Sequence, residues 1–280
     1  MSSELTAHHY DQATKAWRYF MGEDLHYGYF LRPDEPLPVA TQNLTARMAE
    51  HGHMVGDDGP LEVLDVGCGV GAAAFYLAQR GGCRVTGIST SPVGVQIARE
   101  RAAQLGLQQQ VTFHCGDGMD NGLADRCVDR VLVLESSHLM MQKDRLIMEC
   151  ARVLRVGGRI ALCDVMFRAR LEPAQLVRHA YTFQLLRRVF GPAKLEPLFF
   201  YRQLAENNGL EVIVAEDTSR RMRPTFAHWK DNAQRHRSKA EQLIGTEGWA
   251  QFVEACDRLT TLWDQAILGY GLLVMRKGTH

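Results

Sequence analysis

The chain has 280 residues, 46% of them hydrophobic, which is enough for one large domain or for a domain with an inserted cap. Lys and Arg together number 32, as do Asp and Glu, and no basic stretch is interleaved with aromatic residues, so the charge pattern favours no nucleic-acid partner. Seven scattered cysteines without C-x-x-C spacing, the lack of a leader-like N-terminus and the lack of a long apolar run predict a cytoplasmic protein with no membrane association.

The first 55 residues are rich in aromatic and histidine side chains. Tyr10, Trp17 and Phe20 recur at helical spacing and predict a helix over residues 10–20. The following DLHYGYF stretch, which contains Tyr27, fits neither a helix nor a strand period and predicts a loop that covers something. Three prolines then break the chain before a helix predicted over residues 38–54.

The stretch VLDVGCGVG, residues 63–71, reads as a strand, a tight turn and the start of a helix. Glycine at alternate positions permits positive φ angles and lets a ligand contact bare backbone beside a helix N-terminus. The glycines alone leave NAD, FAD and S-adenosylmethionine open. Asp65 favours the last, because a carboxylate beside the loop suits a cationic, amine-bearing ligand and repels a pyrophosphate.

Strand and helix patterns alternate regularly beyond this loop. We predict helices over residues 72–80, 92–105 and 143–154 and strands over 84–89, 110–115, 128–134 and 159–165, with Gly157 and Gly158 as a turn. This alternation predicts an α/β fold whose mostly parallel sheet has helices on both faces. Ligands bind at the carboxyl ends of such strands, so we expect four side chains along one rim: Asp65, Ser89, Asp117 and Glu135.

The regular pattern lapses after residue 166. Residues 167–208 contain predicted helices over 173–190 and 198–207, and a segment of this length between strands is too long for a connector, so we interpret it as an inserted helical cap. A strand over 210–215, helices over 225–244 and 246–266 and a strand over 269–276 complete the predicted elements.

These residues resemble the class I S-adenosylmethionine-dependent methyltransferases. The resemblance is carried by residues 63–71, by Gly116 and Asp117, and by ECARVLRVGGRIAL over 149–162. It implies a Rossmann-like sheet of seven strands with the last one antiparallel. It also implies that the glycine loop cradles the methionine end of the cofactor, that Asp65 helps to hold the amino group and that Asp117 accepts a hydrogen bond from the adenine amine.

A narrower resemblance is to small-molecule methyltransferases such as the tocopherol, sterol and natural-product tailoring enzymes. It rests on HYDQ and DLHYGYF near the start, on residues 85–98 and on LESSHLM over 134–140. It implies that Tyr27 covers the methionine end of the cofactor. The family at large has an acidic residue after the second strand, whereas this chain has Ser89 and Thr90, with Gln96 in the next helix. The absence of that carboxylate also argues against NAD.

The resemblance implies four regions. They are an N-terminal helical lid over the cofactor (1–55), a cofactor-binding core (56–166), the substrate cap (167–208) and the remaining strands and helices of the core (209–280). The predicted cofactor-binding residues are Tyr27, Asp65, Gly67, Cys68, Gly69, Ser89, Thr90, Gln96, Asp117, Gly118 and Glu135.

His138 is the predicted general base, because an imidazole titrates near neutral pH and this one follows the fourth strand closely; Tyr27 is the second predicted catalytic residue. His8, His9 and His26 are weaker candidates for the base. For Glu135 we expect a backbone contact to the donor's amino group and a side chain that shapes the pocket. The spacing of His, Cys and carboxylate residues predicts no metal site.

The predicted function is transfer of a methyl group from S-adenosylmethionine to an oxygen, nitrogen or carbon atom of a small, largely apolar metabolite, in secondary metabolism. The aromatic and aliphatic residues of the cap favour such an acceptor, and a homo-oligomer is compatible with the sequence. Three alternatives stay open. They are a cyclase or isomerase that binds the cofactor without methyl transfer, a non-catalytic scaffold that binds it, and an NAD-dependent oxidoreductase.

Overall fold

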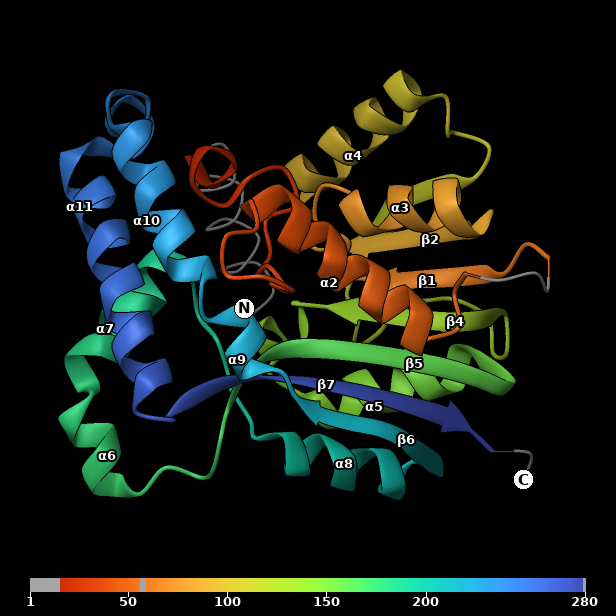
Figure 1. Cartoon of the computed structure of the whole chain (residues 1–280). Helices are drawn as coiled ribbons and strands as arrows, with labels where there is room; N and C mark the ends of the chain where they lie inside the picture. Colours follow the sequence, from red (N-terminus) through yellow and green to blue (C-terminus); the bar gives the residue numbers. More distant parts are fainter. Residues whose placement is uncertain (1–15, 56–58, 279–280) are drawn as a thin grey trace.

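The computed structural model describes residues 16–55 and 59–278 of the chain. A sheet of seven strands lies at its centre, with the spatial order β3-β2-β1-β4-β5-β7-β6 (Figure 1). The strands are β1 (Glu62–Val66), β2 (Arg84–Ser89), β3 (Val111–Cys115), β4 (Val128–Leu134), β5 (Leu154–Phe167), β6 (Leu210–Asp217) and β7 (Leu268–Lys277).

β7 is the strand that differs in direction. It lies between β5 and β6 and runs antiparallel to both, whereas β1 to β5 pair in parallel. The predicted seven-stranded, mostly parallel Rossmann-like sheet with an antiparallel last strand is therefore confirmed. Because the parallel strands all end at one edge, the residues that follow them gather there.

Helices cover both faces of the sheet, and an apolar core lies between the helices and the sheet on each face. On one face lie α2 (Leu37–His51), α3 (Ala72–Gly81) and α4 (Pro92–Leu105). On the other lie α5 (Lys143–Val153) and α8 (Leu198–Asn207). The fold is thus a three-layer α/β arrangement.

The remaining helices lie beyond the carboxyl ends of the parallel strands, on the left of Figure 1. They are α6 (Pro173–Arg178), α7 (Ala180–Phe190), α9 (Ser219–Met222), α10 (Thr225–Arg235) and α11 (Arg237–Asp264). α11 packs against α7 and α10. The predicted cap over 167–208 therefore differs from the structure in extent, because α8 packs on the sheet while α10 and α11, from the region predicted as core, join the helices beyond its edge.

Three predicted boundaries were wrong. Gly157 and Gly158, predicted as a turn, lie within β5. An added Cβ on Gly158 would stand 2.7 Å from the Asp129 carbonyl oxygen, so β5 passes too close to β4 there for any residue other than glycine. The helix predicted over 173–190 divides at His179, and the one over 225–244 divides at His236. The predicted break near Gly245 is present as a kink inside α11.

The N-terminal prediction is covered only in part. Residues 16–21 are helical, and the earlier part of the helix predicted over 10–20, with Tyr10, lies outside the described residues. So do His8 and His9. No helix in the described ranges combines the length and apolar character needed to cross a bilayer.

Candidate active site

Two cavities open at the carboxyl edge of the sheet. The first lies between the glycine loop after β1 and the ends of β2 and β4. Its wall contains nine of the predicted site residues: Asp65, Gly67, Cys68, Gly69, Ser89, Thr90, Asp117, Gly118 and Glu135. The parallel topology thus brings together side chains from four separate stretches of sequence.

The glycine loop is shaped by its surroundings. Gly67 has φ +81°, and an added Cβ there would stand 2.1 Å from the Cβ of Ser136. Gly69 has φ +52°, but an added Cβ would meet no heavy atom within 4 Å, since the first cavity is in front of it. Gly71, also at positive φ, is the N-cap of α3. The loop therefore presents bare backbone to the first cavity beside a helix N-terminus.

Asp65 brings an uncompensated carboxyl group to this cavity. Its side chain is only 2% exposed, and its Oδ2 atom has no hydrogen-bond partner within residues 16–55 and 59–278. Burial raises the pKa of Asp65 to about 7. A cationic group bound here would supply the missing partner and restore the charged form.

Two polar side chains follow the ends of β2 and β3, and each accepts a hydrogen bond from a backbone N–H group. Ser89 Oγ accepts the N–H of Ser91 at 3.2 Å, and Asp117 Oδ1 accepts the N–H of Met119 at 2.9 Å. These short contacts hold the side chains at the wall of the first cavity.

The second cavity is larger, about 590 Å³, and its wall is mostly aromatic and aliphatic. Its residues come from the N-terminal segment, the loop after β4, the end of β5, α6, α7, the loop over 191–195, α10, α11 and the start of β7. Leu25 and Glu135 line both cavities, so the two spaces meet at these side chains.

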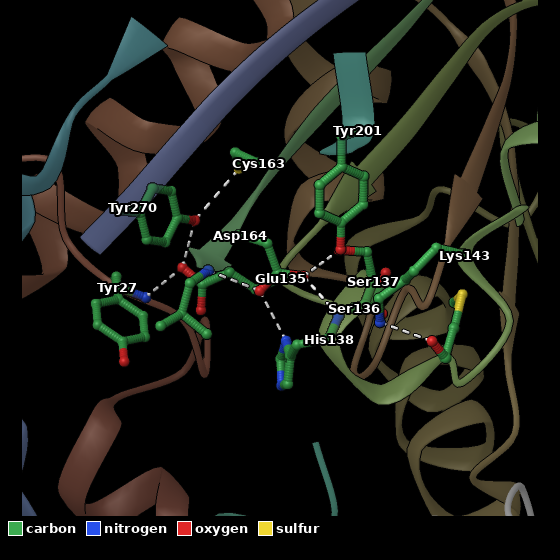
Figure 2. Close-up of polar contacts among 12 residues, drawn as sticks. Tyr27, Glu135, Ser136, Ser137, His138, Lys143, Cys163, Asp164, Tyr201 and Tyr270 are labelled. Carbon is green, nitrogen blue, oxygen red and sulfur yellow. Dashed lines mark hydrogen bonds and ion pairs between the residues drawn. The ribbon is translucent and has the colours of Figure 1, made fainter. Parts of the chain in front are cut away.

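Glu135 holds an unusual position at this junction. It adopts φ +50°, a left-handed conformation that is rare outside glycine. Its Oε1 atom accepts the backbone N–H of Tyr27 at 2.9 Å and the hydroxyl of Tyr270 at 2.6 Å (Figure 2). Burial nevertheless raises the pKa of Glu135 well above its usual value. The carboxyl group therefore links the N-terminal segment to β7 at the point where the cavities join.

His138 lies on the wall of the second cavity and pairs with Asp164. Its Nδ1 atom is 2.7 Å from Oδ1 of Asp164, which is fully buried. Because a carboxylate only accepts, Nδ1 carries the hydrogen and the lone pair is left on Nε2, on the far side of the ring (Figure 2). This is the arrangement of an oriented general base.

Asp164 is kept ionised by its contacts. Besides His138 Nδ1, it accepts the backbone N–H groups of His138 and Val165, both at 2.8 Å, and the hydroxyl of Ser137 at 2.6 Å. Burial opposes the charge, but the charge and hydrogen bonds of His138 and the hydrogen bond from Ser137 hold the pKa of Asp164 below its usual value. Because a charged carboxylate only accepts hydrogen bonds, Asp164 orients the imidazole of His138.

The short helix η1 (Ser137–Leu139), which carries His138, is held in place by hydrogen bonds to buried side chains of α5 and α8. Lys143 is 1% exposed, and its Nζ donates to the carbonyl groups of Ser137 and of Met140, the latter at 2.6 Å. The hydroxyl of Ser137 also lies 2.9 Å from that of Tyr201 on α8. Burial lowers the pKa of Lys143 to about 8.

Comparison with known proteins identifies the family of the chain. A methyltransferase-domain family model matches residues 64–162. Methyltransferase GfsG of Streptomyces halstedii is 34% identical over 78% of this chain and 76% of its own length. The 27-O-demethylrifamycin SV methyltransferase of Amycolatopsis mediterranei is 34% identical over 91% of this chain and 90% of its own length.

The chain belongs to the class I S-adenosylmethionine-dependent methyltransferases. Its fold is also that of the 4+2 cyclase SpnF, whose crystal structure superposes with a TM-score of 0.84 at 25% identity over 99% of this chain and 97% of that one. The predicted family and cofactor are confirmed, and the NAD alternative is set aside.

The first cavity of this methyltransferase fits S-adenosylmethionine. The unpartnered carboxyl oxygen of Asp65 suits an ammonium group, and the open space before Gly69 admits a ligand against the backbone. Besides Tyr27, which lines the second cavity, Gln96 is the predicted cofactor-binding residue that lies outside the first cavity. It is exposed, its Nε2 donates to Glu100 on the same helix at 2.8 Å, and it does not line the cavity. Helix α4 turns it outward, so the structure does not bring Gln96 together with the other predicted cofactor-binding residues.

Tyr27 and His26 are neighbours in the sequence but line different cavities. Tyr27 lines the second cavity, where its ring packs at 4.9 Å from Trp229 and 5.5 Å from Tyr270, and only its backbone reaches Glu135. His26 lines the first cavity, and its Nδ1 lies 2.9 Å from the Tyr27 carbonyl. Burial lowers the pKa of His26, which disfavours the imidazolium.

Sequence reasoning did not find Asp164, Tyr270 and Lys143. Asp164 could have been found by the rule that found Asp65 and Glu135, because it too is a carboxylate near the carboxyl end of a parallel strand. No local pattern indicated Tyr270 or Lys143. Tyr270 contacts Glu135, which is distant in the sequence, and Lys143 contacts backbone carbonyl groups.

Proposed function

We propose that this methyltransferase transfers the methyl group to a hydroxyl oxygen of a small, largely apolar acceptor bound in the second cavity. The observation that carries the proposal is the His138–Asp164 pair on the wall of that cavity, next to its junction with the first. A hydroxyl group keeps its proton at neutral pH and needs a base when it attacks, which distinguishes it from a free amine or a thiolate.

The first cavity would hold the cofactor through named groups. Asp65 would bind the amino group, the backbone at Gly67 to Gly69 would face the methionine end, and Ser89 and Thr90 would face the ribose. Asp117 would accept a hydrogen bond from the adenine amine. Cys68, Gly118 and Glu135 would complete the wall of the first cavity. When bound, S-adenosylmethionine supplies an electrophilic methyl group on a sulfonium.

His138 would receive the hydroxyl proton at Nε2, and Asp164 would hold the ring in place and stabilise the imidazolium that forms. The apolar wall excludes water and keeps the acceptor oxygen aligned with the junction at Glu135. Tyr27 contributes as a wall of the second cavity and as the backbone donor to Glu135.

Residues 17–27 would act as a lid over both cavities. Asp24, Leu25 and His26 line the first, while Trp17 and Met21 line the second. Helices α6, α7, α10 and α11 would form the cap over the acceptor. This assignment narrows the predicted lid from residues 1–55 to residues 17–27 and moves the cap boundary to match the packing described above.

The test is a screen of small apolar alcohols and phenols with the purified protein and S-adenosylmethionine, scored by mass spectrometry. The expected product gains one methyl group on oxygen, and S-adenosylhomocysteine appears in equal amount. If only amines or carbon nucleophiles gain a methyl group, the assignment to a hydroxyl acceptor fails.

A second candidate function is a cyclase that binds the cofactor without using it, which the similarity to SpnF over nearly the whole chain favours. The same screen separates the two functions. A cyclase would convert its substrate to a product of unchanged mass and would form no S-adenosylhomocysteine.

A further inference from the structure

Four side chains on the wall of the second cavity can carry a charge near neutral pH, and three of them have protein partners. Glu135 accepts two hydrogen bonds, His138 is paired with a carboxylate, and Lys194 lies 3.5 Å from Glu196. The fourth, Arg187, has no hydrogen bond, ion pair or aromatic contact within the described parts of the chain. Its positive charge therefore has no partner among residues 16–55 and 59–278.

Arg187 also lies on the side of α7 that lines the cavity, and it is exposed to solvent. The wall residues of this helix are Phe183, Leu186, Arg187 and Phe190, which follow the spacing of one helical face. Its neighbour Arg188 is exposed as well but does not line the cavity, so the two arginines differ in their position relative to it. A cation thus interrupts an otherwise apolar stripe on the cavity side of α7.

The charge on Arg187 discriminates between classes of acceptor. A neutral acceptor that filled the cavity would displace water from the guanidinium. It would offer no hydrogen bond in place of those lost to water, which is unfavourable. An anionic oxygen group would replace that water with charge-assisted hydrogen bonds, and the planar guanidinium suits two oxygens at once.

We propose that the acceptor carries an anionic oxygen group, of the carboxylate, sulfonate or acidic phenol type, in addition to the atom that is methylated, and that Arg187 binds this group. The inference rests on the proposed function in one respect, which is that the second cavity holds the acceptor. It deepens that function by naming the second polar feature of the substrate.

The experiment uses two fluorescent probes with the same aromatic framework. 8-Anilinonaphthalene-1-sulfonate is anionic, and N-phenyl-1-naphthylamine is the uncharged counterpart. Each is titrated into the full chain saturated with S-adenosylhomocysteine, so that the first cavity is occupied. The variants are Arg187→Gln and, as a matched control, Arg188→Gln, both checked for an unchanged melting temperature.

We expect Arg187→Gln to weaken binding of the sulfonate about tenfold or more, the size of a lost charge-assisted hydrogen bond, and to change binding of the neutral probe less than about twofold. Arg188→Gln should leave both affinities within about twofold. The inference is overturned if Arg187→Gln affects neither probe, affects both alike, or has the same effect as Arg188→Gln. These titrations involve no methyl transfer, so a failed acceptor screen and a failed probe test are separate results.

Discussion

The imidazole Nδ1 of His138 lies 2.7 Å from Oδ1 of Asp164, while Oδ2 of the same carboxylate accepts the backbone N–H of His138 at 2.8 Å. One buried carboxylate thus holds both the ring and the main chain of the residue that faces the second cavity. This double contact leaves Nε2 as the one ring nitrogen of His138 that can receive a proton from an acceptor.

Replacing either member of this pair should reduce turnover without affecting the cofactor. We expect His138→Gln and Asp164→Asn to lower kcat about 100-fold or more, because the first removes the base and the second removes the charge that orients it. The Kd of S-adenosylmethionine, measured by calorimetry, should change less than about twofold. His114→Gln, an exposed histidine on β3, is the control. Full turnover of His138→Gln near neutral pH would remove His138 from the mechanism.

Asp65 should make the stability of the free protein depend on pH. Its pKa is raised from 3.8 to about 7 in the folded state, so between these values the folded chain binds more protons than the unfolded chain. The free energy of unfolding should therefore fall as pH rises from about 4 to about 7. Asp65→Asn should remove this part of the slope. Urea unfolding at several pH values measures it, and identical slopes in both proteins would contradict the assignment.

The same carboxyl group should make cofactor binding depend on pH in the opposite sense. Because the amino group of S-adenosylmethionine favours the charged form of Asp65, affinity should rise between about pH 6 and pH 7.5, with release of a proton. Asp65→Ala should abolish detectable binding. Calorimetry in buffers of different ionisation enthalpy gives the number of protons released. Retained tight binding by Asp65→Ala would show that the loop is placed incorrectly.

Three glycine substitutions should separate backbone strain from loss of the cofactor site. Gly69→Ala and Gly106→Ala both place alanine at positive φ, with φ +52° and +69°, and neither added Cβ meets an atom within 4 Å. Each should lower the free energy of unfolding by about 1–2 kcal/mol. Gly69→Ala alone should weaken cofactor binding, by about tenfold or more, because its methyl group enters the first cavity.

Gly67→Ala should instead fail in folding, because its Cβ would collide with Ser136. Thermal unfolding and cofactor titration of the three variants provide the comparison. Equal cofactor affinity in Gly69→Ala and Gly106→Ala would mean that the cofactor does not approach the loop.

Gln96→Ala should leave the Kd of S-adenosylmethionine within about twofold of the parent value. Its side chain is exposed and bound to Glu100, so the substitution removes a surface contact worth a few tenths of a kcal/mol at most. Ser89→Ala, at the wall of the first cavity, is the variant for comparison and should weaken binding more. A larger effect from Gln96 would indicate that α4 rearranges when the cofactor binds.

The sequence by itself determined the sheet, the helices on its faces and the glycine loop. These follow from local patterns, namely the alternation of strand and helix periods and the glycines that permit positive φ at Gly67 and Gly69. The rim of the first cavity was also predictable, because residues that follow parallel strands must meet at one edge of the sheet. The outward orientation of Gln96 was not predictable, because it depends on how α4 packs.

Only the tertiary structure decided what His138 pairs with and what lines the second cavity. Asp164, Tyr201 and Lys143 reach the turn around His138 from three different elements, and Glu135 meets Tyr270 across 135 positions of sequence. The second cavity is likewise assembled from distant helices and loops. Such contacts depend on side-chain packing between elements, and the periodicity of one element carries no information about which residues of another will face it.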